Sequence, residues 1–162
     1  MTRTNEYRTH TCGELRESDI GKEVRVAGWL ENVRDHGGVK FLDLRDHYGI
    51  TQIVVENESL IEGITKESTI SVSGKVVKRD EDTINEKIET GTVEVEACTI
   101  KVLGKTRASL PFDITTSKEI REDLRLKYRY LDLRNREVHN NIVVRSQIIS
   151  HIRRKMTELG FL

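Results

Sequence analysis

The sequence contains few of the residues that mark disulfide-rich, metal-binding or proline-rich proteins. Its 162 residues include 2 cysteines, 1 proline and 5 histidines. Cys12 and Cys98 lie far apart and lack the close spacing of zinc ligands, so we predict two reduced thiols, as in a cytosolic protein. The histidines form no cluster in the sequence, and no metal site is expected.

The chain also lacks the segments that direct a protein to a membrane or out of the cell. No apolar run approaches the roughly 20 residues of a membrane-spanning helix, and no signal peptide opens the chain. A composition of 36% apolar and 33% charged residues is typical of a soluble globular protein. We therefore expect a cytoplasmic protein with no membrane partner, long enough for one domain and part of a second.

Neither sign of charge is in excess, because the chain has 27 basic and 27 acidic residues. This balance hides an asymmetry. Residues 118–162 hold 11 lysines and arginines against 6 acidic residues, whereas residues 1–117 hold 16 against 21. A protein that coats nucleic acid through uniform positive charge is disfavoured, but one that reads specific bases with local positive charge remains compatible with the sequence.

Residues 24–56 alternate between apolar and polar side chains, with two interruptions. The interruptions are the turn signals His36-Gly37-Gly38 and Asp46-His47-Tyr48-Gly49, so the stretch predicts three consecutive antiparallel strands. Two more alternating runs follow. Beyond residue 56 we predict a short helical turn at 57–65, strands at 69–79 and 92–103, and a polar hairpin loop at 80–90.

Five short strands with this spacing predict a mainly β chain built on an OB-fold, a small five-stranded barrel. Gly28 and Gly74 are expected to supply the bends that closure of the barrel requires. Trp29 is expected to contribute to packing of the barrel.

The C-terminal third has helical periodicity. After a linker at 105–111, residues 117–133 predict one helix and residues 138–159 a second helix that ends at Gly160. The second helix carries an apolar stripe that requires a partner surface, and we therefore expect the chain to be part of a longer protein. The stripe consists of Val138, Ile142, Ile149, Ile152, Met156 and Leu159.

One aromatic side chain, Phe41, shares the more polar face of the second predicted strand with charged residues. A tight hairpin places Phe41 opposite either Gln52 or Val54, and in both registers Phe41 and Gln52 share a face. Arg34 approaches the same face from the end of the first strand. An aromatic ring, an amide and a guanidinium together form a suitable site for an unpaired base.

Two further residues add hydrogen-bonding groups to this predicted site. Asn85 comes from the loop, and Glu94 comes from the fifth strand, where its carboxylate suits base edges better than phosphates. Each candidate also has an ordinary structural interpretation, and these alternatives stay open at this point. They are a satellite core position for Phe41, a solvated strand position for Gln52, a surface position for Arg34, turn formation for Asn85 and cross-strand pairing for Glu94.

Four segments, taken in order, resemble the front of a bacterial-type aspartyl-tRNA synthetase. They are AGWLENVRDHGGVKFLDLRDHYGITQIVV, RDEDTINEKIETGTVEVEA, LPFDI and LRLKYRYLDLR. The resemblance covers essentially the whole chain, and asparaginyl- and lysyl-tRNA synthetases share only parts of these segments. It implies an OB-fold anticodon-binding domain at 1–106, a linker and hinge with a helix at 107–137, and the beginning of a class II catalytic domain at 138–162.

The resemblance also implies roles for individual residues. Phe41 matches the aromatic residue of the family that stacks on the central anticodon base. Arg34, Gln52 and Glu94 match positions that contact anticodon bases.

Four loop and turn positions are assigned by the same resemblance. Arg79 and Asn85 match positions near the first anticodon base. His36 and Thr83 match positions that vary between enzymes specific for aspartate tRNA and enzymes that also charge asparagine tRNA. His36 resembles the second type, so we treat relaxed specificity as a hypothesis.

The parent enzyme implied by the resemblance attaches aspartate to tRNA with ATP and magnesium, and forms a homodimer through a helix at 141–161. The motifs that bind ATP and the aminoacyl adenylate are not among these residues. We therefore expect the chain itself to bind tRNA, to use no cofactor and to be inactive as a ligase. One departure concerns the run Glu31-Asn32-Val33-Arg34, which has one arginine where the family usually has two or three.

Three alternatives to this interpretation remain. The chain could be a free-standing OB-fold protein that binds RNA or single strands. It could belong to another class IIb synthetase, asparaginyl or lysyl. It could also be an OB-fold that acts as a protein adaptor.

Overall fold

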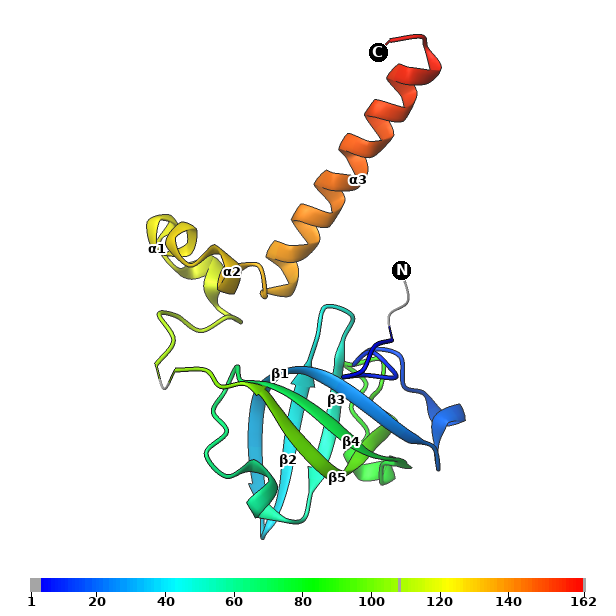
Figure 1. Ribbon diagram of the computed structural model, residues 1–162, viewed down its shortest axis with the longest axis vertical. Helices are drawn as coiled ribbons and strands as arrows, with labels where there is room; N and C mark the ends of the chain where they lie inside the picture. The colour runs from blue at the N-terminus through cyan, green and yellow to red at the C-terminus, as the bar shows by residue number, and fades with distance from the viewer. Residues whose placement is uncertain (1–3, 108, 162) are drawn as a thin grey trace. The chain divides into compact units, whose positions relative to one another are not determined.

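The computed structural model describes residues 4–107 and 109–161. The chain forms two compact units, one before and one after residue 108. The first unit contains all five strands, and the second contains the three α-helices (Figure 1). Each unit has a hydrophobic core of its own.

The first unit is a closed ring of five strands in the order β1-β2-β3-β5-β4 (Figure 1). The pairing between β3 and β5 is parallel, and all the others are antiparallel. This arrangement confirms the predicted five-stranded OB-fold, with strand bounds that differ from the predicted ones by at most one residue. The strands are β1 (Glu23–His36), β2 (Val39–Arg45), β3 (Ile50–Val55), β4 (Thr69–Lys78) and β5 (Val93–Gly104).

The core of this unit follows from the period-two alternation of the strands. Apolar residues at alternate positions of all five strands point into the ring and are buried, while their neighbours face outward. The hairpin register places Phe41 opposite Val54 and Asp43 opposite Gln52, which confirms one of the two predicted registers. The buried apolar strand residues are Val24, Val26, Leu30, Leu42, Leu44, Ile53, Val55, Ile70, Val72, Val76, Val93 and Val95.

Two glycines allow the strands to approach closely where the ring closes. A Cβ atom on Gly28 would lie 2.2 Å from the carbonyl oxygen of Arg45, and one on Gly74 would lie 2.0 Å from that of Glu96. The register of β4 against β5 also shifts between Ser73 and Gly74. Both glycines were predicted from the sequence, and the close backbone approach is the physical reason for them.

The prediction that Trp29 packs within the barrel is wrong. Its neighbour Leu30 points inward, so Trp29 lies on the outer side of β1. There its ring contacts the ring of His47 edge-on, with 5.1 Å between centroids, and the Arg45 guanidinium lies 5.5 Å from the indole. The predicted helical turn after β3 is present as a 3-10 turn at Glu58–Ile61.

The second unit corrects the prediction of one continuous helix over residues 117–133. The segment breaks into a 3-10 turn (Ser117–Glu119), α1 (Glu122–Lys127) and α2 (Arg129–Asp132). Tyr128 leaves helical geometry, with φ −114° and ψ 44°, and thereby separates the two short helices. The side chains of Arg125, in α1, and Arg129, in α2, both contact one buried carboxylate, that of Asp132.

The long helix α3 (Arg136–Glu158) begins two residues before its predicted start. Asn135 is its N-cap, because its Oδ1 accepts hydrogen bonds from the backbone N–H groups of Glu137 and Val138. Gly160 follows the helix with φ +86°, as expected for a C-terminal stop. No helix among residues 4–107 and 109–161 is both long and apolar enough to cross a membrane.

Candidate nucleic-acid interface

Strand registry arranges the outer face of β1, β2, β3 and β5 into two parallel rows of side chains. The first, which we call the aromatic row, consists of Arg34, Phe41, Val54 and Glu96. Each of these residues is paired with the next across neighbouring strands. The second, the polar row, lies beside it and runs from β1 to β5. Its members are Asn32, Asp43, Gln52 and Glu94.

Phe41 lies at the surface and is only partly buried, in contrast to its neighbour Leu42, which is fully buried in the core. The imidazole of His36, from the end of β1, contacts the Phe41 ring edge-on with 5.6 Å between centroids. The structure therefore does not place Phe41 in the core, the alternative that would have removed the candidate site.

Hydrogen bonds connect the polar row into a continuous chain. Asp43 accepts from Asn32 Nδ2 through Oδ2 at 3.3 Å and from Arg34 Nη2 through Oδ1 at 2.7 Å. The same Arg34 nitrogen donates to Gln52 Oε1 at 3.0 Å, and Gln52 Nε2 donates to Glu94 Oε2 at 2.7 Å. Arg34 thus links the aromatic row to the polar row, and three of the predicted site residues meet directly.

Glu94 lies at one end of this chain, partly withdrawn from solvent. Burial raises the pKa of Glu94, and the hydrogen bond from Gln52 and the charge of Arg79 offset part of the increase. The Arg79 Nε atom lies 3.7 Å from Glu94 Oε2. Burial lowers the pKa of Arg79, and the charge of Glu94 opposes that change.

Arg79 itself is buried beneath the interface and is not displayed on it. Its Nε donates to the carbonyl oxygen of Val93 at 3.1 Å, and its Nη1 donates to that of Thr83 at 3.3 Å. Within the part of the chain that the structure describes, its buried Nη2 has no hydrogen-bond partner. The side chain therefore holds the loop after β4 against β5 and places a positive charge behind Glu94.

The other two predicted loop residues stabilise turns in the segment 80–91. The Thr83 hydroxyl donates to the carbonyl oxygen of Asp80 at 2.9 Å. The Asn85 Oδ1 accepts from the backbone N–H of Lys87 at 3.1 Å, which is the turn-forming alternative weighed from the sequence. Both remain predictions as tRNA contacts, and these hydrogen bonds do not link them to the two rows.

Sequence reasoning did not identify Asp43 and Asn32 as parts of the site. Alternation places Asp43 on the same face as Phe41, but the role of Asp43 depends on which basic side chain it pairs with. That partner is Arg34, nine residues earlier in the chain and on the neighbouring strand. Registry between β1 and β2 was the missing information.

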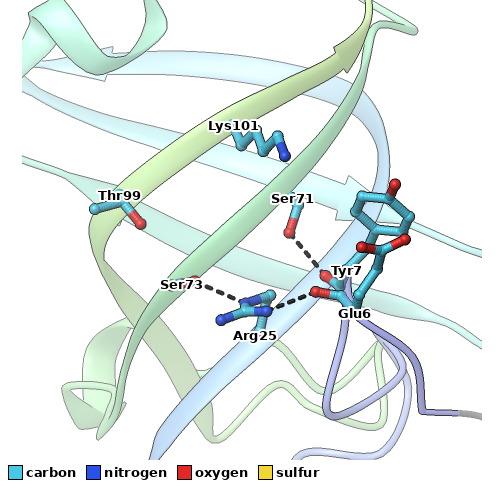
Figure 2. Close-up of a pocket in the computed structure, with 7 residues that line it drawn as sticks. All are labelled: Glu6, Tyr7, Arg25, Ser71, Ser73, Thr99 and Lys101. Carbon is cyan, nitrogen blue, oxygen red and sulfur yellow. Dashed lines mark hydrogen bonds between the residues drawn. The ribbon is translucent and has the colours of Figure 1, made fainter.

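A separate hollow of about 300 Å³ lies on the outer side of β1, β4 and β5, under the N-terminal segment (Figure 2). Arg25 Nη1 donates to the carbonyl oxygen of Glu6 at 2.6 Å, and the Ser71 hydroxyl donates to that of Tyr7 at 2.7 Å. These bonds tie residues 6–7 to the sheet. We therefore interpret this hollow as a space between the N-terminal segment and the sheet, separate from the two rows.

Two family models match the chain. Residues 24–103 match the OB-fold nucleic acid binding domain, and residues 121–162 match the class II tRNA synthetases of the D, K and N type. The first match covers every residue of the two rows.

Similar proteins with curated names point to the same group. The chain is 53% identical over 96% of its length to "Aspartate--tRNA ligase" of Streptomyces coelicolor, and 52% identical over 97% to "Aspartate--tRNA(Asp/Asn) ligase" of Rickettsia canadensis. It spans 27% of the length of each of these relatives.

Among solved structures, the fold is similar to that of the aspartyl-tRNA synthetase from Entamoeba histolytica. The TM-score is 0.79 at 22% identity, and the match covers 93% of this chain and 37% of the other. At this level of identity the likeness concerns the fold alone.

Proposed function

We propose that this chain, which belongs to the family of the aspartate–tRNA ligases, reads the anticodon of a tRNA through its aromatic and polar rows. The observation that carries the proposal is a surface aromatic ring, Phe41, beside a hydrogen-bonded chain of base-reading groups on an OB-fold. OB-folds bind single-stranded nucleic acid on this kind of outer face, with bases stacked on aromatic side chains.

The charges of the site favour contact with bases over contact with phosphates. Two carboxylates, Asp43 and Glu94, lie in the polar row, and carboxylates repel phosphate but accept hydrogen bonds from base amines and imines. Arg34 is the one arginine of the two rows, so local positive charge is modest. This balance agrees with the absence of net charge in the chain.

The activity of the full-length protein is also proposed. We infer that it couples aspartate to tRNA in the cytoplasm, with ATP and magnesium bound by residues beyond those of this chain. The exposed apolar side chains of α3 and its C-cap support a homodimer, because eight residues of this kind along one helix and its end need a partner surface. They are Ile142, Val143, Val144, Ile148, Ile149, Ile152, Met156 and Leu159.

A wider substrate range has support from one position. His36 contacts Phe41, so the residue at this position touches the proposed stacking platform. Relatives with both printed names, for aspartate tRNA alone and for aspartate and asparagine tRNA, are about equally similar to the chain. Aminoacylation of asparagine tRNA by the full-length enzyme tests the hypothesis, and an absence of charging would remove it.

Calorimetric titration of the chain with aspartate tRNA and with anticodon-swapped transcripts tests anticodon reading. We expect tighter binding of the cognate transcript, with Gln52→Ala and Glu94→Ala reducing the preference more than the affinity for swapped transcripts. Binding that is equal for all anticodons would contradict the proposal. An OB-fold that acts as a protein adaptor would show no dependence on the anticodon.

A further inference from the structure

The amide group of Gln52 is hydrogen-bonded at both of its ends. Its Oε1 accepts from the Arg34 guanidinium, and its Nε2 donates to the Glu94 carboxylate. A 180° rotation would place the NH₂ group against the guanidinium and the oxygen against the carboxylate, so both contacts would become repulsive. The amide therefore has one favoured orientation in the free protein.

That orientation depends on Asp43. The Arg34 side chain is 48% exposed, and an exposed arginine has many accessible rotamers unless an ion pair holds it. Asp43 Oδ1 accepts a charge-assisted hydrogen bond from the same Nη2 atom that contacts Gln52. The Asp43 side chain is only 19% exposed, and its second oxygen accepts from Asn32. Asp43 is thus itself fixed.

We propose that Asp43 is a positioning residue for base selection, because it holds Arg34 against Gln52 and so determines which atoms of the amide an incoming base meets. The inference rests on the proposed anticodon-reading function and deepens it. Uridine and cytidine have the same size but exchange a donor and an acceptor on their pairing edges, where uridine offers O4 and N3–H and cytidine offers N4–H₂ and N3. A fixed amide distinguishes these edges, whereas an amide that turns over freely accommodates both.

The variant Asp43→Asn keeps the size of the side chain and removes its charge. Uridine pairs with the adenine at the centre of aspartate codons, so the test compares aspartate tRNA with its variant carrying cytidine at the middle anticodon position. We expect the preference of the wild-type chain for uridine to fall about tenfold in Asp43→Asn. An undiminished preference would overturn the proposal.

A matched control is Asp35→Asn, which removes the same charge near the end of β1. Asp35 accepts hydrogen bonds from Lys40 and Gly38 and lies outside both rows, so the preference should persist. In a Gln52→Ala background, Asp43→Asn should have no further effect on the preference, because Asp43 acts through Gln52. A full additional loss in the double variant would contradict that route.

The positioning role is also testable without tRNA. In NMR spectra of the free chain, the side-chain amide signals of Gln52 should shift in Asp43→Asn and stay in place in Asp35→Asn. Unchanged signals in both variants would overturn the inference even if anticodon reading is correct. If the Gln52 signals shift in Asp43→Asn but the wild-type chain shows no anticodon preference, the positioning role stands and the proposed function is refuted.

Discussion

At the residue scale, the site depends on a few side chains whose direction is set by strand alternation. Phe41 faces outward because Leu42 faces inward, and β2 has no irregularity between them. Gly28 and Gly74 act at the same scale, since each stands where another backbone leaves no room for a side chain. Substitution of Phe41 is expected to lower the affinity for tRNA, and substitution of Gly74 is expected to lower the stability of the first unit.

The variant Phe41→Ala should weaken binding of aspartate tRNA by about 1–3 kcal/mol, because one stacked base loses its platform. The fold should persist, since the ring is not part of the buried core. Tyr48→Ala is a suitable control, because it removes an aromatic side chain that is 45% exposed in the β2–β3 turn, outside both rows. Equal losses of affinity in the two variants, measured by calorimetry, would contradict a specific stacking role for Phe41.

The variant Gly74→Ala should destabilise the first unit by about 1–3 kcal/mol or more, because the new methyl group must displace the backbone of Glu96. Gly104→Ala is the matched control, since among the described residues no atom other than those of Gly104 and its two chain neighbours lies within 4 Å of the position of its added Cβ. Thermal unfolding followed by the fluorescence of Trp29, the single tryptophan, measures the difference. A melting temperature of Gly74→Ala equal to that of Gly104→Ala would show that the strands adjust without cost.

At the level of secondary structure, the second unit has two short helices in place of one long helix, and a buried ion cluster joins them. Asp132 is fully buried and accepts from Arg125 Nε at 3.0 Å, and Arg129 pairs with the same carboxylate. Arg129 and Asp132 lie three residues apart within α2, whereas Arg125 reaches the same carboxylate from α1, across the break at Tyr128. The cluster therefore gives the second unit a pH dependence of its own.

Burial by itself would raise the pKa of Asp132, but hydrogen bonds and the charges of Arg125 and Arg129 outweigh it and lower the pKa below 3.8. A lowered pKa in the folded state stabilises the unit above pH 3.8, and this contribution is lost as the pH falls through the folded value. Asp132→Asn should therefore be less stable than wild type at pH 7, and the difference should shrink below about pH 4.

The helical circular dichroism signal during thermal unfolding measures this difference, because the α-helices lie in the second unit. Asp123→Asn serves as the control, since its carboxylate pairs with Arg121 at an exposed position where such pairs contribute little. A gap between wild type and Asp132→Asn that stays constant from pH 7 to pH 3 would exclude linkage through this carboxylate.

At the scale of the whole molecule, the two units carry different kinds of surface. The first presents a balanced polar face for bases, and the second presents an apolar stripe along α3. Exposure of these apolar side chains of α3 to water is unfavourable, so association of two chains through this helix is favoured.

The variant Ile152→Asp should therefore reduce self-association of the chain in sedimentation experiments. Ile152 is 54% exposed and belongs to the stripe. Gln147→Asp adds the same charge at a helix position outside the stripe and should leave association unchanged. The same sedimentation behaviour in the two variants would argue against α3 as the contact surface.

Much of this protein could be predicted from local sequence alone. Alternation of apolar residues and turn signals determined the strands, the hairpin and the outward direction of Phe41, because these depend on neighbours along the chain. The same local patterns missed the break at Tyr128, since helical periodicity continues through residues 117–133. For Trp29, the alternation that places Leu30 in the core already indicates an outward side chain.

The pairing of charges across strands follows from the three-dimensional fold and not from local sequence. The hydrogen-bonded polar row, from Asn32 through Asp43 and Gln52 to Glu94, joins four strands. Its members are separated by up to 62 positions in sequence. Side-chain alternation specifies a face but not a neighbour on that face, which follows from strand registry and closure of the ring. The sequence therefore determined which residues are displayed, and the fold determined which of them act on one another.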